Sequence, residues 1–351
     1  MFPFAGARLF AASKGAPPPS LDRRFLVGSR NSGSETLRVT KTIAVVGAGV
    51  SGLTSAIVLA EHGHRTAIFA EESGSHTTSA AAGAIWYPYD AGPSASTIGW
   101  ALESYRVLQD LARDSRSGVS MIEQRVYSRA GEIEIPAWAE PLGARRFRTR
   151  ADIPAAFTSG FAIDVPLMDT TIYLDYLARR FAAAGGVTNA QVRFEKLEDI
   201  AQGFDPIINC AGIGARTLVP DPDLEPHRGQ VALMPKMDLT CAIVCDDPPL
   251  MYAIPRTNDC VFGGTNDLSD DRAVDAEATA RIVAECSRVL EVNKPEVLAE
   301  PVGIRPFRRS GVRVERTELR DGRAVIHNYG HGGAGFTLSW GCAREVLRLA
   351  A

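Results

Sequence analysis

The chain has 351 residues, of which 45% are hydrophobic and 23% are charged, and its formal net charge is -3. This composition is typical of a folded globular protein of one large or two modest domains, and it excludes collagen-like and mainly disordered chains. Without a basic excess, nucleic acid and anionic membrane surfaces are not expected as partners.

The first 40 residues differ from the rest of the chain. They carry six Lys and Arg residues against two acidic ones, and they are rich in Gly, Pro, Ser and Ala. We expect a flexible tail at residues 1–40. The alternative is a leader-like segment, because organelle transit peptides are also basic, contain serine and hold few acids.

Regular structure is predicted from residue 42 onward. An apolar, β-branched run at residues 42–46 predicts a buried parallel strand, and a helix is predicted at 53–62 and a strand at 65–70. Asp169 is expected to cap an amphipathic helix over residues 170–184, because an aspartate at that place accepts a hydrogen bond from the first turn. A further buried strand is predicted at residues 206–210.

The sequence pattern changes between about residues 227 and 265. Short β-rich runs separated by Pro, Asp and Asn predict an antiparallel sheet. These runs are residues 230–234, 241–245, 251–254 and 260–262. Beyond them the pattern predicts a helix at 276–290, strands at 312–316 and 324–327, and a last helix at 336–349.

These elements predict an α/β protein in which a Rossmann-like domain is interleaved with an antiparallel-sheet (α+β) domain. The segments expected in the Rossmann-like domain are 42–92, 168–226 and 306–351. The segments expected in the other domain, which would bind the substrate, are 93–167 and 227–305. The six cysteines contain no CxxC pair, so we expect buried free thiols and no metal site, although a disulfide involving Cys286 stays open.

A glycine-rich motif follows the first predicted strand. Residues 47–52 read GAGVSG, a GxGxxG turn between a strand and a helix, which is typical of a dinucleotide site. The expected cofactor contacts are Gly47, Ala48, Gly49, Val50, Ser51 and Gly52. Glu71 follows the second strand, where a carboxylate accepts a ribose hydroxyl bond and disfavours a 2′-phosphate. The motif also explains the uncharged stretch 42–60 without a membrane span.

A second glycine-rich motif, GHGGAG at residues 330–335, lies late in the chain. Only 16 residues follow it, fewer than the roughly 30 that a second βαβ unit needs. It therefore presents backbone N–H groups at the start of the last helix. That arrangement suits the carbonyl edge of a flavin, which gains negative charge on reduction.

The chain resembles the D-amino-acid oxidases, a family of FAD enzymes that includes the D-aspartate oxidases. The resemblance extends over residues 42–349 and is carried by five segments. They are VVGAGVSGL at 45–53, AAGAIWYPY at 81–89, RGQ at 228–230, GIRPFR at 303–308 and HNYGHGGAGFT at 327–337.

The resemblance implies a site for each part of the reaction. Arg305 corresponds to the anchor of the substrate α-carboxylate, Tyr252 to a tyrosine whose hydroxyl touches the same group, and Gly333 to the carbonyl that receives the amine. Tyr87 corresponds to a residue beside the flavin. The remaining expected contacts of noncovalent FAD are Glu71, Glu72, Thr77, Thr78, Ser79, Gly83, Ala84, Ile85, Phe194, Gly212, Gly332, Gly333, Ala334, Gly335, Phe336 and Thr337.

The resemblance also implies the chemistry. A hydride passes from Cα to flavin N5, the imine hydrolyses to a 2-oxo acid and ammonia, and O2 reoxidises the flavin to give hydrogen peroxide. The partners implied are a small D-amino acid and O2, and a homodimer is allowed. A cytoplasmic location is expected, and the alternative is an organelle reached through the basic N-terminal tail. The chain ends in RLAA and not in a peroxisomal SKL-type signal.

The substrate side chain is less defined. Some vertebrate members carry a second tyrosine where this chain has Pro248, so a tyrosine lid is not expected. Asp246 and Asp247 would repel an acidic substrate if they face the pocket, which favours neutral D-amino acids; alternatively they only solvate a turn. Arg256 or Arg308 could instead supply a second cation, as a D-aspartate oxidase would need. Three different functions also stay open, namely a glycine- or sarcosine-type amine oxidase, an NAD-dependent dehydrogenase and a non-catalytic flavin-binding protein.

Overall fold

The structure is a computed structural model that describes residues 40–88, 94–293 and 295–351. Residues Thr40–Ala351 form one compact unit. The tail predicted at residues 1–40 therefore lies outside the described residues, except for Thr40.

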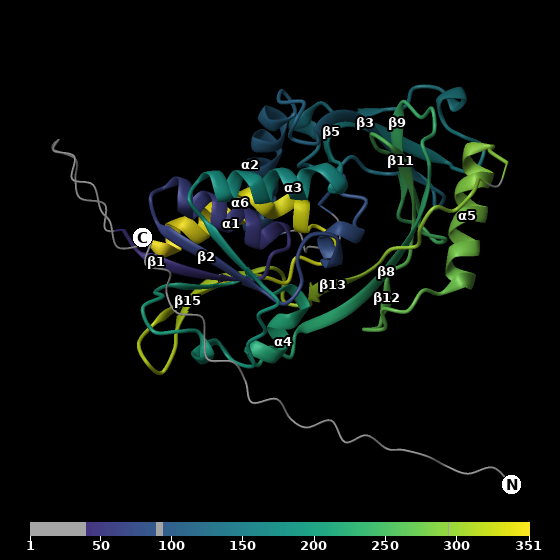
Figure 1. Ribbon diagram of the computed structural model, residues 1–351. Coiled ribbons are helices and arrows are strands. Elements are labelled where there is room, and N and C mark those ends of the chain that lie inside the picture. The colour runs from purple at the N-terminus through teal and green to yellow at the C-terminus, as the bar shows by residue number, and fades with distance from the viewer. Residues whose placement is uncertain (1–39, 89–93, 294) are drawn as a thin grey trace, which may run out of the picture. The chain divides into compact units, whose positions relative to one another are not determined.

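The first of two sheets has six strands in the order β14-β15-β7-β1-β2-β6 (Figure 1). All neighbours are parallel except β14 and β15, which are antiparallel. The strands are β1 (Thr42–Val46), β2 (Arg65–Ala70), β6 (Val187–Ala190), β7 (Ile207–Asn209), β14 (Arg313–Glu318) and β15 (Ala324–Tyr329). The inner strand β1 is almost fully buried, which explains its continuous apolar sequence.

Helices cover one face of this sheet. Figure 1 shows α1 (Val50–Glu61), α3 (Thr170–Ala183) and α6 (Gly335–Ala350) side by side on that face. The helix α2 (Ala95–Leu111) packs against α6 at Gly341, where a Cβ would lie 2.2 Å from the Trp100 carbonyl oxygen. The two helix backbones thus touch because residue 341 has no side chain.

The second sheet has nine strands. Eight follow the order β12-β8-β11-β10-β9-β3-β5-β4, and β13 also pairs with β8. The strands are β3 (Val119–Ser128), β4 (Arg145–Arg146), β5 (Ser159–Met168), β8 (Leu224–Pro235), β9 (Cys241–Cys245), β10 (Met251–Pro255), β11 (Asp259–Gly263), β12 (Asp267–Leu268) and β13 (Val302–Arg308). Their pairing is antiparallel except between β3 and β9. Helix α5 (Ala276–Leu290) packs on β8, β10 and β11, and α4 (Ala215–Leu218) is a single turn.

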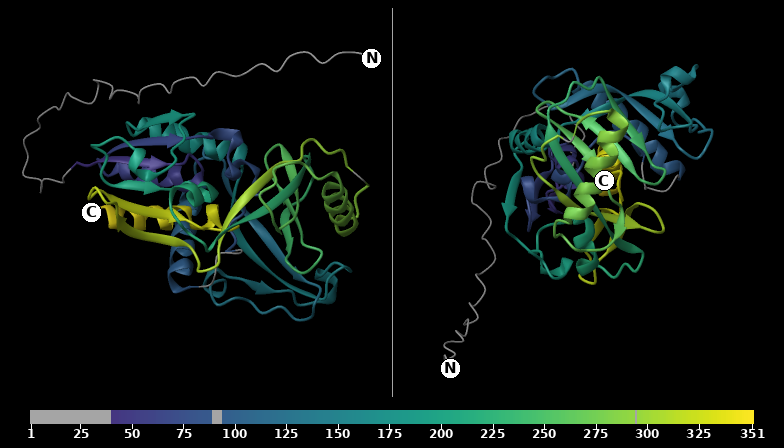
Figure 2. Two further views of the ribbon diagram at one scale, coloured as in Figure 1. Left: turned by 90° about the horizontal axis from the view of Figure 1, so that it is seen from below. Right: turned by 90° about the vertical axis from the view of Figure 1, so that its right-hand side faces the viewer.

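The pair β8 and β13 links the two parts of the unit. Both strands run from beside the first sheet into the second (Figure 2). β13 contacts the turn at Thr78–Ala81 and the turn at Gly212–Gly214, which both belong to the surroundings of the first sheet. Side chains on β13 are thereby placed between the two sheets.

The predicted α/β fold class is confirmed, and most predicted elements have the expected place. Helix α1 begins at Val50, three residues before the prediction, because Gly49 is its N-cap and the end of the glycine motif is already helical. No elements were predicted in residues 93–167, which hold α2, β3 and β5. β5 is buried along its length except at Asp164, so it lacks the polar alternation that marks a strand. The domain boundaries stay a prediction.

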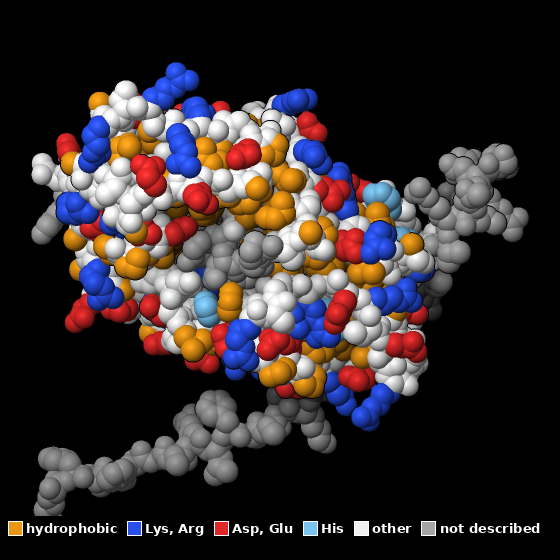
Figure 3. Space-filling model, turned by 180° about the vertical axis from the view of Figure 1, so that it is seen from behind, with side chains coloured by type: hydrophobic (Ala, Val, Ile, Leu, Met, Phe, Trp, Pro, Cys, Tyr) orange, Lys and Arg blue, Asp and Glu red, His pale blue; other side chains and the backbone are white. Residues whose placement is uncertain are grey.

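The six cysteines are buried and unpaired, as expected. Within the described residues, no helix is long and apolar enough to cross a membrane. The uncharged stretch 42–60 forms β1 and most of α1. On the face drawn in Figure 3, basic and acidic side chains of the described residues are interspersed.

Candidate active site

A cavity of about 600 Å³ lies where the turns that follow β1, β2 and β7 meet the strands β8, β10 and β13. The predicted site residues that line it are Gly47, Ala48, Gly49, Val50, Ser51, Glu71, Glu72, Thr77, Thr78, Ser79, Gly83, Ala84, Ile85, Tyr87, Phe194, Gly212, Tyr252, Arg305, Gly332, Gly333, Gly335 and Phe336. Gly52, Ala334 and Thr337 are not among the lining residues. Residues far apart in sequence therefore meet at one cavity.

The glycine motif forms the turn between β1 and α1. Gly47 has φ +107°, and a Cβ on it would lie 2.4 Å from the Cys210 carbonyl oxygen, so only glycine fits there. A Cβ on Gly52 would lie 2.0 Å from the Gly47 carbonyl oxygen. Gly52 therefore allows the helix to pack closely on the strand, which is the role of the third glycine in this motif. This role also explains why Gly52 does not line the cavity.

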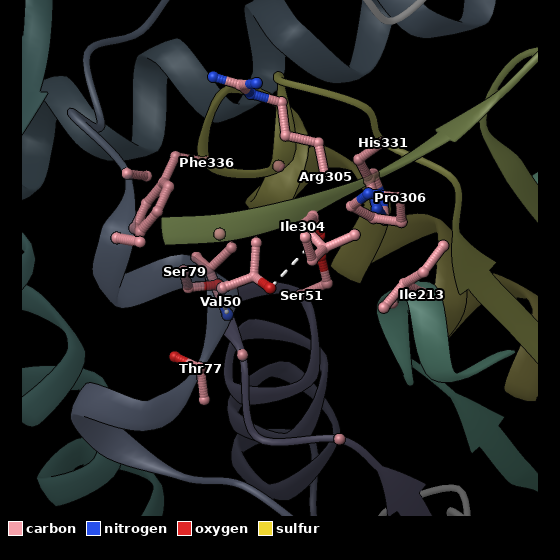
Figure 4. Close-up of a pocket in the computed structure, with 18 of the residues that line it drawn as sticks. Val50, Ser51, Thr77, Ser79, Ile213, Ile304, Arg305, Pro306, His331 and Phe336 are labelled. Carbon is pink, nitrogen blue, oxygen red and sulfur yellow. Dashed lines mark hydrogen bonds between the residues drawn. The ribbon is translucent and has the colours of Figure 1, made fainter. Parts of the chain in front are cut away.

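A hydroxyl-bearing turn faces the start of α1. The Val50 N–H donates to Ser79 Oγ at 3.0 Å, and Ser79 lies beside Val50 in Figure 4. Thr77 Oγ1 donates to the Gly74 carbonyl and Thr78 Oγ1 to the Ile304 carbonyl on β13. These bonds hold the turn against both the helix start and β13.

Two ion pairs lie after β2 at the edge of the cavity. Glu71 pairs with Arg193 at 3.1 Å, and Glu72 pairs with Arg272 at 2.6 Å. All four side chains are well exposed, so each pair contributes little stability. Both arginines also line the cavity, although no sequence motif indicates them.

The second glycine motif surrounds the start of α6. The Gly332 N–H donates to the Pro306 carbonyl at 2.9 Å, which ties the motif to β13. His331 is buried, its Nε2 lies 3.0 Å from Asn328 Oδ1, and burial lowers its pKa to about 4. The imidazole is therefore neutral at pH 7. Ala334 is fully buried and serves as the N-cap of α6, which keeps it out of the cavity.

Arg305 extends from β13 into the cavity, away from the start of α1 (Figure 4). Its Nη1 donates to the Thr265 carbonyl at 2.8 Å and to Asn266 Oδ1 at 3.3 Å. Within the described residues no carboxylate forms an ion pair with it. Since a guanidinium has five N–H donors in a planar fork, the others can meet a carboxylate that enters the cavity.

Tyr252 belongs to β10 and lies beside Arg305, which belongs to β13. Its ring rests on the Gly263 backbone, where a Cβ would come within 1.9 Å of Cζ. Burial raises the pKa of its hydroxyl, and the nearby Arg305 cation opposes that rise. The hydroxyl is therefore protonated at pH 7 and can donate a hydrogen bond.

Tyr87 is held from the last helix. Its N–H donates to Thr337 Oγ1 at 3.0 Å, and Thr337 Oγ1 lies 2.9 Å from the Tyr87 carbonyl oxygen. Thr337 thus positions Tyr87 instead of lining the cavity. The Tyr87 hydroxyl donates to Asp246 Oδ2 at 3.3 Å.

Neither arginine considered as a second substrate cation lines the cavity. Arg256 is buried and binds Asp259 through both Nε and Nη2, and its Nη1 donates to Thr170. Arg308 pairs with Asp221 at 2.9 Å. Both cations form ion pairs outside the cavity, so neither is placed to act as the second substrate cation that a D-aspartate oxidase would need.

Further residues that line the cavity were not predicted from the sequence. Gly229, Ile213, Ile304, Pro306, Asn328 and His331 are examples. Gly229 lies under Arg305, where a Cβ would approach the guanidinium carbon to 2.4 Å. The predicted strand began only at residue 230, whereas β8 includes Gly229. A glycine within a strand often marks such a close approach, so a longer predicted strand would have drawn attention to it.

Comparison with known proteins identifies the family. Residues 42–349 match the model of the DAO family, described as FAD dependent oxidoreductase. The chain belongs to this family. It is 40% identical to a D-amino-acid oxidase of Streptomyces coelicolor over 88% of this chain and 96% of that protein. It is 37% identical to one of Rubrobacter xylanophilus over 89% and 97%, and 31% identical to human D-aspartate oxidase over 88% and 94%.

Solved structures support the same fold. Glycine oxidase from Geobacillus kaustophilus superposes with a TM-score of 0.75 at 18% identity, over 88% of this chain and 94% of that chain. L-amino acid deaminase from Proteus vulgaris gives 0.73 at 11% identity, over 92% and 96%. At such identities the likeness supports the fold alone.

The residues present fit the FAD that this family uses. Gly47, the N-terminus of α1 and Glu71 match the needs of a dinucleotide, because a backbone without side chains approaches a pyrophosphate and free N–H groups face it. The start of α6 at Gly335 lies on the same cavity and carries no acidic residue in its first turn. The chain is an FAD-dependent oxidoreductase.

Proposed function

We propose that this protein oxidises D-amino acids to 2-oxo acids, with release of ammonia and hydrogen peroxide, and that Arg305 and Tyr252 hold the substrate carboxylate. The observation that carries the proposal is Arg305, a cation inside the cavity without a carboxylate partner among the described residues. Its fork suits a bidentate grip, and the Tyr252 hydroxyl would donate a further hydrogen bond. The D-amino-acid oxidase relatives support the same chemistry.

Bound FAD would supply the electron sink, since it accepts two electrons as a hydride and returns them to O2. The residues of the chain position the substrate. Arg305 and Tyr252 fix one end of the substrate, and the Gly333 carbonyl would accept a hydrogen bond from its amine. Such positioning lowers the barrier because the reacting atoms are held in contact before reaction.

The decisive experiment is a peroxide assay of the purified protein with D-alanine, L-alanine, glycine, sarcosine and D-aspartate. We expect activity on D-alanine, none on L-alanine, and less on D-aspartate than on neutral D-amino acids. Activity on glycine or sarcosine but not on D-alanine would instead support a glycine-oxidase-type enzyme. Denaturation should release FAD and not FMN.

Arg305→Leu tests the anchor directly. This variant should keep its FAD and lose substrate affinity, because a carboxylate deprived of a buried charge partner loses about 2–5 kcal/mol. Arg309→Leu is the matched control, since Arg309 is exposed and pairs with Glu225 outside the cavity. Equal kinetics of the two variants would contradict the proposed anchor.

A homodimer and a cytoplasmic location stay predictions. Light scattering coupled to size-exclusion chromatography measures the first, and localisation of a tagged chain in its own cell measures the second.

A further inference from the structure

Arg228 is a buried cation that binds the backbone of a neighbouring loop. It lies on β8 and is only 6% exposed. Its Nε donates to the Asp271 carbonyl at 3.1 Å, and its Nη2 donates to the Ala273 carbonyl at 2.6 Å. These two carbonyls flank Arg272. The backbone on both sides of Arg272 is therefore fixed by a side chain of β8.

Gln230 fastens the same loop where it joins α5. Gln230 is fully buried, its Oε1 accepts from the Asp275 N–H at 3.0 Å, and its Nε2 donates to the Asp275 carbonyl at 2.8 Å. Asp275 is the N-cap of α5. The loop between β12 and α5, residues 269–275, is seen in Figure 1. Two buried side chains of β8 thus hold this β12–α5 loop.

The β12–α5 loop reaches the first sheet through Arg272. Its Nη1 pairs with Glu72 Oε1 at 2.6 Å, and both residues line the cavity. Glu72 follows β2 of the first sheet, whereas Arg272 follows β12 of the second sheet. The other ion pair at this edge, Glu71 with Arg193, joins segments that follow β2 and β6, which are neighbours in one sheet. Only the Glu72–Arg272 pair of these two therefore links the two sheets.

The end of β2 marks the part of the cavity that the adenosine of a dinucleotide would occupy. In the dinucleotide fold a carboxylate after the second strand meets the ribose, and Glu71 has that place. Glu72 is the next residue. The ion pair between the sheets therefore lies at the adenosine end of the expected FAD site, on the opposite side of Glu72 from the glycine motif in sequence and at the edge of the cavity in space.

We propose that the Glu72–Arg272 ion pair is a strap that retains FAD, so that release of the cofactor requires this pair to open. The inference rests on FAD binding and is independent of the substrate. The two side chains are 40% and 51% exposed, so the pair contributes little to folding. It acts on the rate of release, because bound FAD leaves only from the open fraction.

The hydrogen bonds of Arg228 and Gln230 explain why an exposed ion pair is effective at this place. They fix the backbone that carries Arg272, so less conformational freedom is lost each time the pair closes. The strap therefore combines a firmly held loop with a single pair that can break.

The test dilutes the holoenzyme well below its melting temperature and follows the appearance of free FAD in filtrates over time. Glu72→Gln and Arg272→Gln should each speed release by roughly two- to fivefold, the range for exposed ion pairs. The double variant should release FAD no faster than the single variants, because all three lack the same pair. Added salt should speed release more from the wild type than from the variants.

Two outcomes would overturn the strap. If Arg272 bound FAD without Glu72, Glu72→Gln would leave the release rate unchanged, and the converse holds for Arg272→Gln. If the two residues acted separately, the double variant would show the product of the single effects.

Glu103 and Arg344 provide the matched control. They pair at 2.7 Å between α2 and α6, their side chains are 34% and 51% exposed, and neither lines the cavity. Glu103→Gln and Arg344→Gln should therefore leave the release rate unchanged. Equal acceleration in these variants would indicate a general loss of stability and would contradict the strap.

The outcomes are distinguishable from those of the proposed function. Release kinetics are measured without substrate, so oxidation of D-alanine together with unchanged release in Glu72→Gln removes only the strap. Faster release in both single variants supports the strap whatever substrate is oxidised.

Discussion

The substitution Gly229→Ala perturbs the substrate anchor without removing it. Gly229 lies on β8, and its φ is not in the left-handed region, so alanine fits the backbone there. The added Cβ would lie 2.4 Å from Cζ and Nη1 of Arg305 and 2.5 Å from Nη2. The backbone can stay in place, because what it meets is the far end of a flexible side chain.

The size of the effect follows from these distances. An ordinary van der Waals contact begins at 3.4 Å, so the guanidinium must retreat from 2.4 Å to at least 3.4 Å, a shift of about 1 Å. A misplacement of about 1 Å in a group that positions substrate can cost about 100-fold in rate. We therefore expect kcat/KM for D-alanine to fall by about 100-fold, with the FAD content unchanged.

Steady-state kinetics and the flavin absorbance of the purified variants measure the two quantities. Gly214→Ala is the matched control: Gly214 also lines the cavity, its φ is -62°, and a Cβ there would meet only the Ala211 Cβ at 3.7 Å. This control should stay close to wild type. If Gly229→Ala also keeps wild-type kcat/KM, the position of Arg305 does not limit the reaction and the anchor assignment is wrong.

Three further outcomes follow from the contacts described. Tyr252→Phe should lose about tenfold in kcat/KM at constant FAD content, as expected for a hydrogen bond to a charged group, and an unchanged kcat/KM would exclude that bond. Arg129→Leu should lower the melting temperature, because Glu285 loses an ion-pair partner in a pair whose side chains are each only 16% exposed; an unchanged melting temperature would contradict this. Burial lowers the pKa of His327 and His331 to about 4, against 6.5 unfolded. Between pH 4 and 6.5 the unfolded chain therefore binds more protons than the folded one. As the pH is lowered from 6.5 toward 4, urea titrations should show the free energy of unfolding falling by about 1.4 kcal/mol per pH unit for each of the two histidines. A flat profile would contradict buried neutral histidines.

The fold was predictable wherever one residue pattern matched one element. The buried run of β1 and the capped amphipathic helix α3 were found with nearly correct ends, since Asp169 accepts from the Thr171 N–H as a cap should. β5 was not predicted because both of its faces are buried and its sequence has no alternation. α2 was also missed, although Ser94 caps it.

The site was predictable where a backbone requirement selects one residue type. Gly47 has a positive φ and a carbonyl within 2.4 Å of the missing Cβ, so its glycine is a direct sign of the turn. The role of Gly229 was not predictable in this way. It depends on the antiparallel register of β8 and β13, in which Arg228 pairs with Ile304 and His227 with Arg305, and on the rotamer that brings the guanidinium over residue 229.

The place of Asp246 shows why adjacent like residues need a structure to be told apart. From sequence, both could face the pocket, or both could only solvate a turn before Pro248. The pairing of Met251 with Cys245 leaves five residues, 246–250, to connect the strands. The alternation of side chains along β9 places Asp246 on the same side as Val244 and Tyr252. Asp247 instead accepts a hydrogen bond from Ser128 at the end of β3. Both the register and the neighbouring strand are long-range features that residue type does not encode. Arg129 holds this loop from the neighbouring strand, because its Nη1 donates to the carbonyls of Asp247 and Pro249.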